Sequence, residues 1–427
     1  MLKDITVILV HYSNQPILNK ALTSLKQIGS RLEKVIVIQE RQIPLGSTDG
    51  CEWLEGFESI IADHSDIGIT LNNIIQQITS KYVLFLEKTD YLSSYDVIDS
   101  MLPSDQRPIL GTTYYNQNIA IQRPFLVLTS YLQKGNLLPD YEVPFKESLL
   151  SAWLSSIDNS NKTFKNGFVR QLGKNSSINT LKRNEFIQKY QLEKVKTNHP
   201  SLSVIISNYN MEKYVGTAIT SCLLQNEQLE QILIMDDGST DNSLEKLRRW
   251  NNEERIMVLN KKNEGKARAL NDLLPHVTSD FILELDADDW LDPDAVSIIK
   301  KHLSVLPDDA SVLYGNFRKW KQLGTDVAFK GIAKGTVING KRDLLTYRFP
   351  LCPRIYRTVS LKSAGGFPVS EFEDGRLYED VSVLHRLLKK GSRLLYRDFT
   401  VYNVREHKES ITKSHPANWN DFLKTLK

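Results

Sequence analysis

The sequence predicts an α/β protein built from two similar domains in tandem, each with a mainly parallel central sheet flanked by helices. Short β-branched runs such as residues 7–10 and 204–206 alternate with amphipathic segments, a pattern typical of a parallel sheet with helices on its faces. The chain also repeats part of its own sequence. In the second half, carboxylates directly follow two of the apolar runs, and ligands of such sheets bind beyond the carboxyl ends of the strands. We therefore expect one crevice lined by acidic side chains.

The internal repeat holds through several segments in the same order. Residues 32–40 match residues 229–237, and residues 82–90 match residues 281–289 at an offset that differs by only two residues. Agreement in order along so much of the chain indicates two copies of one domain rather than chance similarity.

The composition limits which classes of function this protein can have. The 427 residues are 41% hydrophobic and 25% charged, with a net charge of +3. These values are ordinary for a globular protein, and such a charge balance argues against nucleic-acid binding. The cysteines, Cys51, Cys222 and Cys352, are far apart in the sequence, which predicts reduced thiols in a cytosolic setting rather than a disulfide framework or a zinc site.

The N-terminal apolar run is too short for a signal peptide. No stretch reaches the roughly 20 apolar residues of a membrane span. We therefore expect a cytoplasmic protein, and peripheral attachment to a membrane through a basic helix stays open.

Composition shifts divide the chain into four segments. The first copy spans residues 1–178 and the second spans residues 200–418. Residues 179–199 between them are polar and rich in lysine, with apolar residues at helical spacing. We interpret them as a linker helix that ends in a turn before Pro200. Residues 419–427 form a tail with too little pattern to interpret.

The most informative stretch is residues 281–290, where an apolar run leads into Asp286, Asp288 and Asp289. Clustered like charges at the end of a buried strand need a cation or hydrogen-bond donors. Hard carboxylate oxygens suit Mg²⁺ or Mn²⁺ shared with substrate phosphates. A solvated acidic turn is the commoner explanation of a lone Asp-x-Asp. A calcium loop is excluded, because Trp290 stands where that loop needs an acid.

Two further clusters accompany the acidic stretch. Asp236 and Asp237 end an apolar run and precede a glycine, so their carboxylates can accept hydrogen bonds from a base or ribose. A turn and capping role explains the residues after them equally well. Residues 263–271 place a glycine before a helix that carries Lys266 and Arg268. These cations could hold a diphosphate, or they could lie on a solvated helix face.

The last cluster lies towards the C-terminus. Glu379 and Asp380 open an amphipathic helix, and a carboxylate at a helix N-terminus stays ionised and available as a proton acceptor. A plain N-cap is the alternative. His407 could complete an oxygen-rich metal site, although a lone histidine is more often structural.

Residues 202–412 resemble a family 2 glycosyltransferase of the GT-A fold, because five short motifs stand in the order found in that family. Sugar nucleotidyltransferases share this general architecture, but the sequence lacks their glycine-rich signature with a following lysine. The resemblance implies a base contact by Ser207 and Tyr209, base and ribose binding by Asp236 and Asp237, diphosphate binding by Lys266, nucleotide contact by Asp286, a metal site of Asp286, Asp288 and His407, and a catalytic pair of Glu379 and Asp380 with Asp380 as the base.

The first copy departs from this pattern at the corresponding positions. Residues 39–41, Gln-Glu-Arg, replace Asp-Asp-Gly, and residues 87–89, Glu-Lys-Thr, replace Asp-Ala-Asp. Lys146 and Glu147 align with the catalytic pair. Because Lys88 puts a positive charge where the metal ion would bind, we expect neither metal binding nor nucleotide turnover in this copy.

The resemblance therefore implies a metal-dependent inverting glycosyltransferase. It would use Mn²⁺ or Mg²⁺ and a nucleotide-sugar donor, a UDP-sugar by resemblance, with a saccharide or glycoconjugate acceptor as in surface polysaccharide synthesis. The alternative is a non-catalytic carbohydrate-binding or scaffold protein built from glycosyltransferase-like domains. The first copy favours that alternative, and the acidic set of the second opposes it. The first domain could also contact a partner protein or a second copy of the chain.

Overall fold

The computed structural model describes residues 3–39, 53–62, 67–93, 102–135, 142–173, 177–197, 200–251, 253–346, 351–369, 372–408 and 419–426. Glu40, Arg41 and Cys51 lie outside these ranges. The chain forms two compact units, Met1–Gln191 and Leu192–Lys427.

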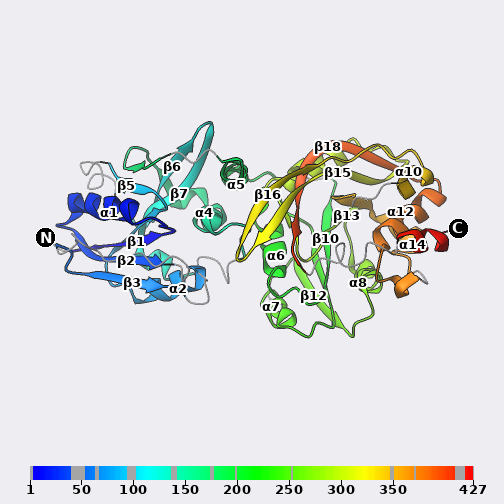
Figure 1. Cartoon of the computed structure of the whole chain (residues 1–427), viewed down its shortest axis with the longest axis horizontal. Helices are drawn as coiled ribbons and strands as arrows, with labels where there is room; N and C mark the ends of the chain where they lie inside the picture. Colours follow the sequence, from blue (N-terminus) through cyan, green and yellow to red (C-terminus); the bar gives the residue numbers. More distant parts are fainter. Residues whose placement is uncertain are drawn as a thin grey trace. The chain divides into compact units, whose positions relative to one another are not determined.

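The first unit is an α/β domain (Figure 1). Its strands are β1 (Ile5–Val10), β2 (Leu32–Gln39), β3 (Phe57–Ile61), β4 (Tyr82–Glu87), β5 (Asp90–Leu92), β6 (Ile109–Asn116), β7 (Ile119–Leu128), β8 (Lys162–Phe164) and β9 (Val169–Gln171). Its helices are α1 (Gln15–Ser24), α2 (Ile67–Gln77), α3 (Thr129–Leu132), α4 (Leu149–Ser156) and α5 (Ile178–Gln188). Helix α1 begins after Asn14, whose side chain accepts a hydrogen bond from the amide of Ile17. Such a cap satisfies an amide that the first turn leaves without a helical partner.

The central sheet of the first unit has the strand order β3-β2-β1-β4-β7-β6-β8. Strand β1 is parallel to β2 and β4, and β2 is parallel to β3. Strand β7 is antiparallel to both β4 and β6, whereas β8 is parallel to β6. The parallel strands therefore end at one edge, as the sequence pattern predicts.

The second unit is a larger α/β domain. Its strands are β10 (Leu202–Asn208), β11 (Ile232–Asp237), β12 (Ile256–Lys261), β13 (Phe281–Glu284), β14 (Trp290–Leu291), β15 (Ala310–Leu323), β16 (Asp326–Ala333), β17 (Arg354–Arg357) and β18 (Arg393–Glu406). Its helices are α6 (Val215–Leu223), α7 (Ser243–Arg248), α8 (Lys266–Leu273), α9 (Ala295–Leu303), α10 (Lys341–Thr346), α11 (Thr358–Ser363), α12 (Glu379–Lys389) and α14 (Trp419–Thr425).

The sheet of the second unit repeats the topology of the first. Its order is β12-β11-β10-β13-β17-β15-β18-β14, with β16 paired to β15. Strands β12, β11, β10 and β13 are parallel neighbours. Strand β17 is antiparallel to β13 and β15, and β18 is parallel to β15. Each pair from β12 to β18 thus has the same sense as its counterpart, which confirms two α/β domains with mainly parallel sheets and the internal repeat.

The two sheets differ beside the acidic loop. In the second unit, β18 is one strand of 14 residues that pairs with β15 and, near its end, with β14. In the first unit two short strands make the corresponding pairings: β8 pairs with β6, and β9 pairs with β5. Among the described residues, one long strand therefore ties the acidic loop to the main sheet in the second unit, whereas the first unit has two separate short strands in its place.

Strand β10 shows why the apolar runs form buried strands. Leu202, Val204 and Ile206 join one hydrophobic cluster with α6, and Ile205 joins another with α8. Successive side chains of a strand point to opposite faces. A continuous apolar strand therefore suits a sheet that helices cover on both faces.

Helix α5 occupies the polar segment where the sequence pattern predicts a helix. Phe186 and Tyr190 are buried, and the ring of Phe186 packs on Phe145 with centroids 5.2 Å apart. The helix accordingly packs within the first unit, which ends at Gln191.

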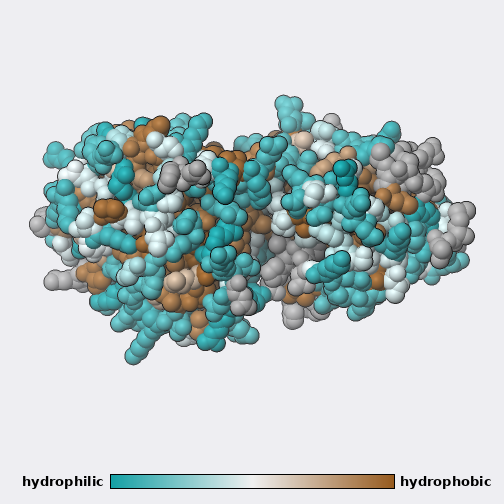
Figure 2. Space-filling model, turned by 180° about the vertical axis from the view of Figure 1, so that it is seen from behind, coloured by the Kyte–Doolittle hydropathy of each residue, from teal (hydrophilic) through white to brown (hydrophobic). Residues whose placement is uncertain are grey.

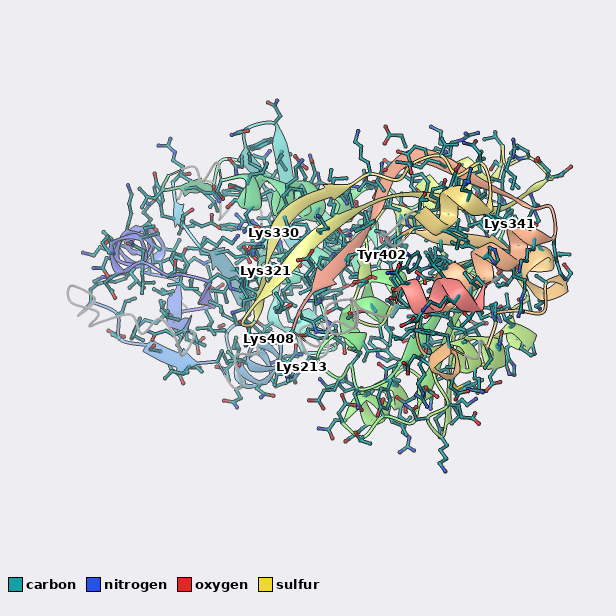
Figure 3. All side chains as sticks on the ribbon, turned by 45° about the vertical axis from the view of Figure 1, so that its right-hand side comes forward. Lys213, Lys321, Lys330, Lys341, Tyr402 and Lys408 are labelled. Atoms are coloured by element: carbon teal, nitrogen blue, oxygen red, sulfur yellow. The ribbon has the colours of Figure 1, made fainter. Side chains whose placement is uncertain are left out.

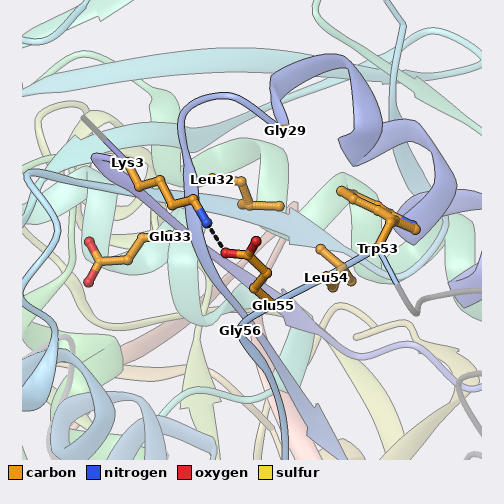
Figure 4. A pocket seen from close by; sticks show the side chains of 8 residues that line it. All are labelled: Lys3, Gly29, Leu32, Glu33, Trp53, Leu54, Glu55 and Gly56. Atoms are coloured by element: carbon orange, nitrogen blue, oxygen red, sulfur yellow. Dashed lines mark hydrogen bonds and ion pairs between the residues drawn. The ribbon is translucent and has the colours of Figure 1, made fainter. Parts of the chain in front are cut away.

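A pocket of about 190 Å³ lies in the first unit near the starts of β1 and β2 (Figure 4). Lys3, Glu33, Trp53 and Glu55 are among the residues that line it, and Lys3 forms an ion pair with Glu55. Because the pocket lies at the amino ends of these strands, it is separate from the carboxyl edge, where ligands of such sheets bind.

Hydrophilic residues cover most of the face shown in Figure 2, and hydrophobic residues gather in separate patches between them. Within the described ranges, no helix has both the length and the apolar character that crossing a membrane requires.

Candidate active site

The acidic stretch forms a loop between β13 and β14 at the carboxyl edge of the sheet. Strand β13 ends at Glu284, so Asp286, Asp288 and Asp289 all lie in this loop. Asp289 is buried and accepts a hydrogen bond from the backbone amide of Arg405 at 2.8 Å. Burial, together with the charges of Asp288 and Asp286, raises the pKa of Asp289 well above its usual value. The half-buried Asp286 and Asp288 are therefore the members that a ligand can reach.

Strand β18 holds this loop in place. Tyr402, labelled on β18 in Figure 3, accepts a hydrogen bond from the amide of Asp286 at 3.1 Å. The Nε atom of Arg405 donates to the backbone carbonyl of Asp288 at 2.9 Å. Two buried side chains of one strand thus fix the backbone on either side of the Asp-x-Asp motif.

His407 follows β18 directly and meets the same loop. Its Nε2 atom lies 2.9 Å from Oδ2 of Asp288, and its ring packs against Tyr214 with centroids 4.7 Å apart. The structure thus brings together two of the three predicted metal ligands from positions far apart in the sequence. A carboxylate oxygen beside an imidazole nitrogen fits Mn²⁺.

Within the described ranges, no three His, Cys, Asp or Glu side chains already form a complete metal cage. A cation at Asp288 and His407 would therefore need further ligands from substrate phosphates and water, which is how Mg²⁺ is commonly held beside phosphates. The residues fit a cation that binds together with a nucleotide.

Lys266, the first residue of α8, lies among three carboxylates. Its Nζ atom is 2.6 Å from Asp286, 2.8 Å from Glu379 and 3.1 Å from Glu284. Burial disfavours the ammonium ion, but the three carboxylates outweigh it and raise the pKa of Lys266 well above its usual value. Gly265 before it has a φ of +94°, a conformation that glycine adopts without strain. The predicted diphosphate-binding cation therefore lies at the metal motif and stays charged.

A buried ion pair supports this cluster, and it was not among the residues predicted from the sequence. Glu284 and Arg354 are 1% and 2% exposed, and the guanidinium donates to both carboxylate oxygens at 2.8 and 3.0 Å. Although burial opposes ionisation, Arg354 and Lys266 lower the pKa of Glu284 to about 2. Arg354 also lies 3.5 Å from Asp380 and 3.7 Å from Asp286. The signal in the sequence was an acid inside an apolar strand, because a buried carboxylate needs a partner.

Glu379 and Asp380 open α12, as the sequence pattern predicts, and Tyr378 holds the N-cap position with a φ of 58°. Glu379 is buried, and this burial, only partly offset by Lys266, raises the pKa of Glu379. One oxygen of the half-buried Asp380 accepts a hydrogen bond from the amide of Val381 at 2.8 Å. The Asp380 carboxylate is thus held at a helix N-terminus beside the metal motif.

The predicted nucleotide-binding carboxylates lie at the end of β11, beside β10. Asp236 is buried and accepts hydrogen bonds from Asn208 at 2.8 Å and from the hydroxyl of Ser239 at 2.7 Å. Asp237 is also buried and accepts from the two consecutive backbone amides of residues 264–265, at 2.9 and 2.8 Å. Asp237 therefore holds the loop that precedes α8, a contact that the sequence pattern did not reveal.

Ser207 and Tyr209 flank Asn208 at the end of β10. Ser207 is half-buried, and Tyr209 is 46% exposed. Asn208 itself is fully buried and links β10 to β11 through Asp236. Of these residues, Tyr209 therefore has the surface that a base lying across the strand end could contact.

Four aromatic rings pack just before the catalytic pair. Helix α14, in the uninterpreted tail, contributes Trp419 and Phe422, which meet Phe372 and Tyr378. The ring centroids of Phe422 and Tyr378 are 4.6 Å apart, and Phe422 is fully buried. The C-terminal helix is thereby anchored on the residue that precedes Glu379.

The class that this fold and this site define is the glycosyltransferases of the GT-A type, in which a parallel sheet carries its acidic motifs at the carboxyl edge. Residues 203–332, all within the second unit, match the family described as Glycosyl transferase family 2. The chain therefore carries, in its second unit, a glycosyltransferase domain that matches family 2 over residues 203–332.

Named relatives match this half of the chain. Glycosyltransferase GlyG of Streptococcus pneumoniae is 26% identical over 224 residues, which cover 50% of this chain and 73% of GlyG. Hyaluronan synthase of Pasteurella multocida is 31% identical over 137 residues, which cover 31% of this chain and 14% of the synthase. The crystal structure of S. aureus TarS 1–349 in complex with UDP-GlcNAc is 20% identical, with a TM-score of 0.40, over 53% of this chain and 65% of that one. This chain spans less than two thirds of the synthase and of the TarS structure.

Proposed function

We propose that the second domain is a metal-dependent inverting glycosyltransferase that moves a sugar from a UDP-sugar to a hydroxyl group of a saccharide or glycoconjugate. The observation that carries this proposal is the position of Lys266. Its ammonium group touches Asp286 of the metal motif at 2.6 Å and Glu379 of the catalytic pair at 2.8 Å. Donor binding and proton transfer therefore share one site.

The donor would lie along the carboxyl edge of the sheet. Tyr209 and Ser207 at the end of β10 would contact the base, and Asp236 with Asp237 would order the loops around base and ribose. Asp286, Asp288 and His407 would hold Mn²⁺ or Mg²⁺ against the diphosphate, and the bound cation would neutralise charge on the leaving nucleotide.

Lys266 supplies a second positive charge at the same place, so it would leave its carboxylate partners in part to contact the diphosphate.

Asp380 would act as the general base. Its carboxylate takes the proton of the acceptor hydroxyl while the oxygen forms a bond to the anomeric carbon. The bond between that carbon and the diphosphate oxygen breaks, and UDP leaves with the electron pair. One displacement from the opposite face of the sugar inverts the anomeric configuration. The backbone amide of Val381 and the guanidinium of Arg354 orient this carboxylate.

The names of the relatives favour a saccharide acceptor. Hyaluronan synthase and chondroitin synthase of Pasteurella multocida each match about a third of this chain at 31% identity. We place the protein in polysaccharide synthesis on that ground. Cys222 and Cys352 are buried free thiols, which supports the cytoplasm as its location. The complete acidic set of the second domain opposes the non-catalytic scaffold alternative.

Release of UDP by the purified full chain tests this proposal. We expect release from at least one member of a panel of UDP-sugars with Mn²⁺, and loss of release in excess EDTA. Asp380→Asn should lower turnover by about 100-fold or more, because an amide cannot accept the proton. Asp309→Asn makes the same change at an exposed carboxylate and should leave the rate unchanged. Metal-independent release, or an unimpaired Asp380→Asn enzyme, would refute the assignment.

A further inference from the structure

The first domain has two buried carboxylates, Glu87 and Asp90, at the positions that correspond to Asp286 and Asp289, and one guanidinium holds both. Glu87 ends β4 and Asp90 begins β5, and they are 4% and 3% exposed. Arg123 of β7 lies 2.9 Å from Oε2 of Glu87 and 2.9 Å from Oδ2 of Asp90. Gln171 donates a further hydrogen bond to Asp90 at 2.8 Å. Burial disfavours the charged form of Arg123, but Asp90 and Glu87 outweigh it and raise the pKa of Arg123. The guanidinium of Arg123 therefore stays positively charged.

The sheet register explains how Arg123 reaches this place. Strands β4 and β7 pair antiparallel, with Leu84 opposite Leu126. Glu87 and Arg123 each lie three residues beyond this pair, and their side chains form an ion pair between the two strands. The guanidinium is thus built into the neighbouring strand of the sheet.

In the second domain the buried arginine lies opposite the last residue of the strand that precedes the metal motif. Strands β13 and β17 pair with Glu284 opposite Arg354, and the pairing ends there, so Asp286 lies in the loop after β13 and Cys352 lies just before β17. Cys352 stands three residues before Ile355, as Arg123 stands three residues before Leu126, so a buried thiol takes the corresponding position in the sequence. Side chains two residues apart share a face of the sheet. Arg354, two residues further along the chain, pairs mainly with Glu284 at 2.8 Å and lies 3.7 Å from Asp286.

The counterpart of the catalytic base is neutralised as well. Glu147 aligns with Asp380, and its Oε1 atom lies 3.1 Å from Lys88 and 3.2 Å from Arg183. Although burial opposes ionisation, these two cations hold the pKa of Glu147 well below its usual value. The carboxylate is charged, and both nearby cations belong to the chain itself.

We propose that the first domain is a closed copy of the donor site, in which Arg123 takes the place of the metal ion and Lys88 with Arg183 neutralises the counterpart of the base. A cation fixed by its own strand cannot be exchanged for a metal–nucleotide complex. The second domain carries its arginine on Glu284 instead and keeps Asp288 and His407 for a cation. Among the described residues, the chain then has one open donor site, and the first domain keeps the fold as a unit that binds no donor.

Counting Mn²⁺ ions on the full chain tests the closed site directly. In the presence of UDP, we expect calorimetry or electron paramagnetic resonance to find about one tightly bound Mn²⁺ per chain, as expected if one of the two copies is open. Asp288→Asn should abolish it. A second bound Mn²⁺, or a bound ion that survives Asp288→Asn, would overturn the proposal.

A second variant asks whether Arg123 stands in for a metal ion. Arg123→Met in the Asp288→Asn background leaves Glu87 and Asp90 without their cation, and we expect added Mn²⁺ to raise the melting temperature of this protein by several degrees. The Asp288→Asn parent should show no such rise. Arg31→Met in the same background is the matched control, because it breaks an Arg–Asp pair of 2.6 Å elsewhere in the first unit.

The control should lose stability without gaining a response to Mn²⁺. A folded Arg123→Met protein that ignores Mn²⁺, or a control that responds equally, would contradict the role of Arg123. If Arg123→Met does not fold, the ion count on the native chain still decides the proposal. The Asp288→Asn parent carries the same second domain, so comparison with it removes any Mn²⁺ response of that domain, and this test stands apart from the function proposed there.

Discussion

Replacing Arg354 with methionine would remove a guanidinium from the interior of the second domain and keep a side chain of similar length. Both oxygens of Glu284 accept hydrogen bonds from Arg354, at 2.8 and 3.0 Å, and both residues are buried. In Arg354→Met the Glu284 carboxylate would keep Lys266, which lies 3.1 Å away, and the hydrogen bond from the Tyr356 hydroxyl at 3.0 Å. The charge stays buried and loses its main partner.

The size of the effect follows from this geometry. Removing one partner of a buried ion pair costs about 3–5 kcal/mol of unfolding free energy. Because Lys266 still contacts Glu284, we expect the lower end, about 3 kcal/mol. For a domain of this size each kcal/mol lowers the melting temperature by about 2–4 °C, so the expected fall is roughly 6–12 °C.

Thermal unfolding of the full chain measures this fall. The second-domain transition is identified as the one that Mn²⁺ with UDP shifts upward, since a ligand stabilises only the state that binds it. The double variant Glu284→Leu/Arg354→Met should recover most of the loss, because an apolar pair needs no partner charge. Its turnover should stay low, because Arg354 also contacts Asp380 at 3.5 Å. A fall of less than about 3 °C, or a double variant no more stable than the single one, would refute this reasoning.

Three further predictions concern the metal site, the C-terminal helix and the first domain. Asp288→Asn should leave folding near normal and weaken Mn²⁺-dependent UDP binding markedly, and unchanged affinity in calorimetry would contradict the metal assignment. Phe422→Ala should lower turnover more than UDP affinity, because it removes the ring that packs on Tyr378 with centroids 4.6 Å apart. Asn420→Ala, on the exposed face of α14, is the control and should change neither turnover nor affinity. Equal effects of the two substitutions would exclude a specific role for the ring. The lowered pKa of Glu147 means that its ion pairs stabilise the first domain above the ordinary value of 4.5 and are lost as the pH falls below it. Urea unfolding of Glu147→Gln should therefore show a lower midpoint at neutral pH and a shallower loss on acidification, and parallel pH profiles would count against this contribution.

Periodicity predicts the elements of this fold because each strand and helix buries a face that its own residues define. The largely apolar sequence of β10 predicts a buried strand. The internal repeat predicts that the second domain has the same kind of sheet as the first. The acidic loop after β13 is also local, so Asp286 and Asp288 could be singled out from neighbours in the sequence. Elements and loops of this kind depend on short-range pattern.

The ion pairs could not be predicted in the same way, because they depend on strand register. Glu284 and Arg354 are 70 residues apart in the sequence and meet only when β17 pairs with β13. Arg123 and Glu87 are brought together by the pairing of β7 with β4 in the first unit. A shift of two residues along a strand decides whether the guanidinium pairs with the counterpart of Asp286, as Arg123 does with Glu87, or mainly with the preceding strand residue, as Arg354 does with Glu284. Sequence pattern gives the face of the strand but not this register.

The anomeric form of the released sugar tests the single displacement most directly. The full chain would be incubated with Mn²⁺ and a UDP-sugar whose sugar is α-linked, with water as the acceptor, and proton NMR would follow the product before it equilibrates. If Asp380 activates the attacking oxygen opposite the leaving diphosphate, the β anomer appears first. Initial formation of the α anomer would contradict the inverting mechanism.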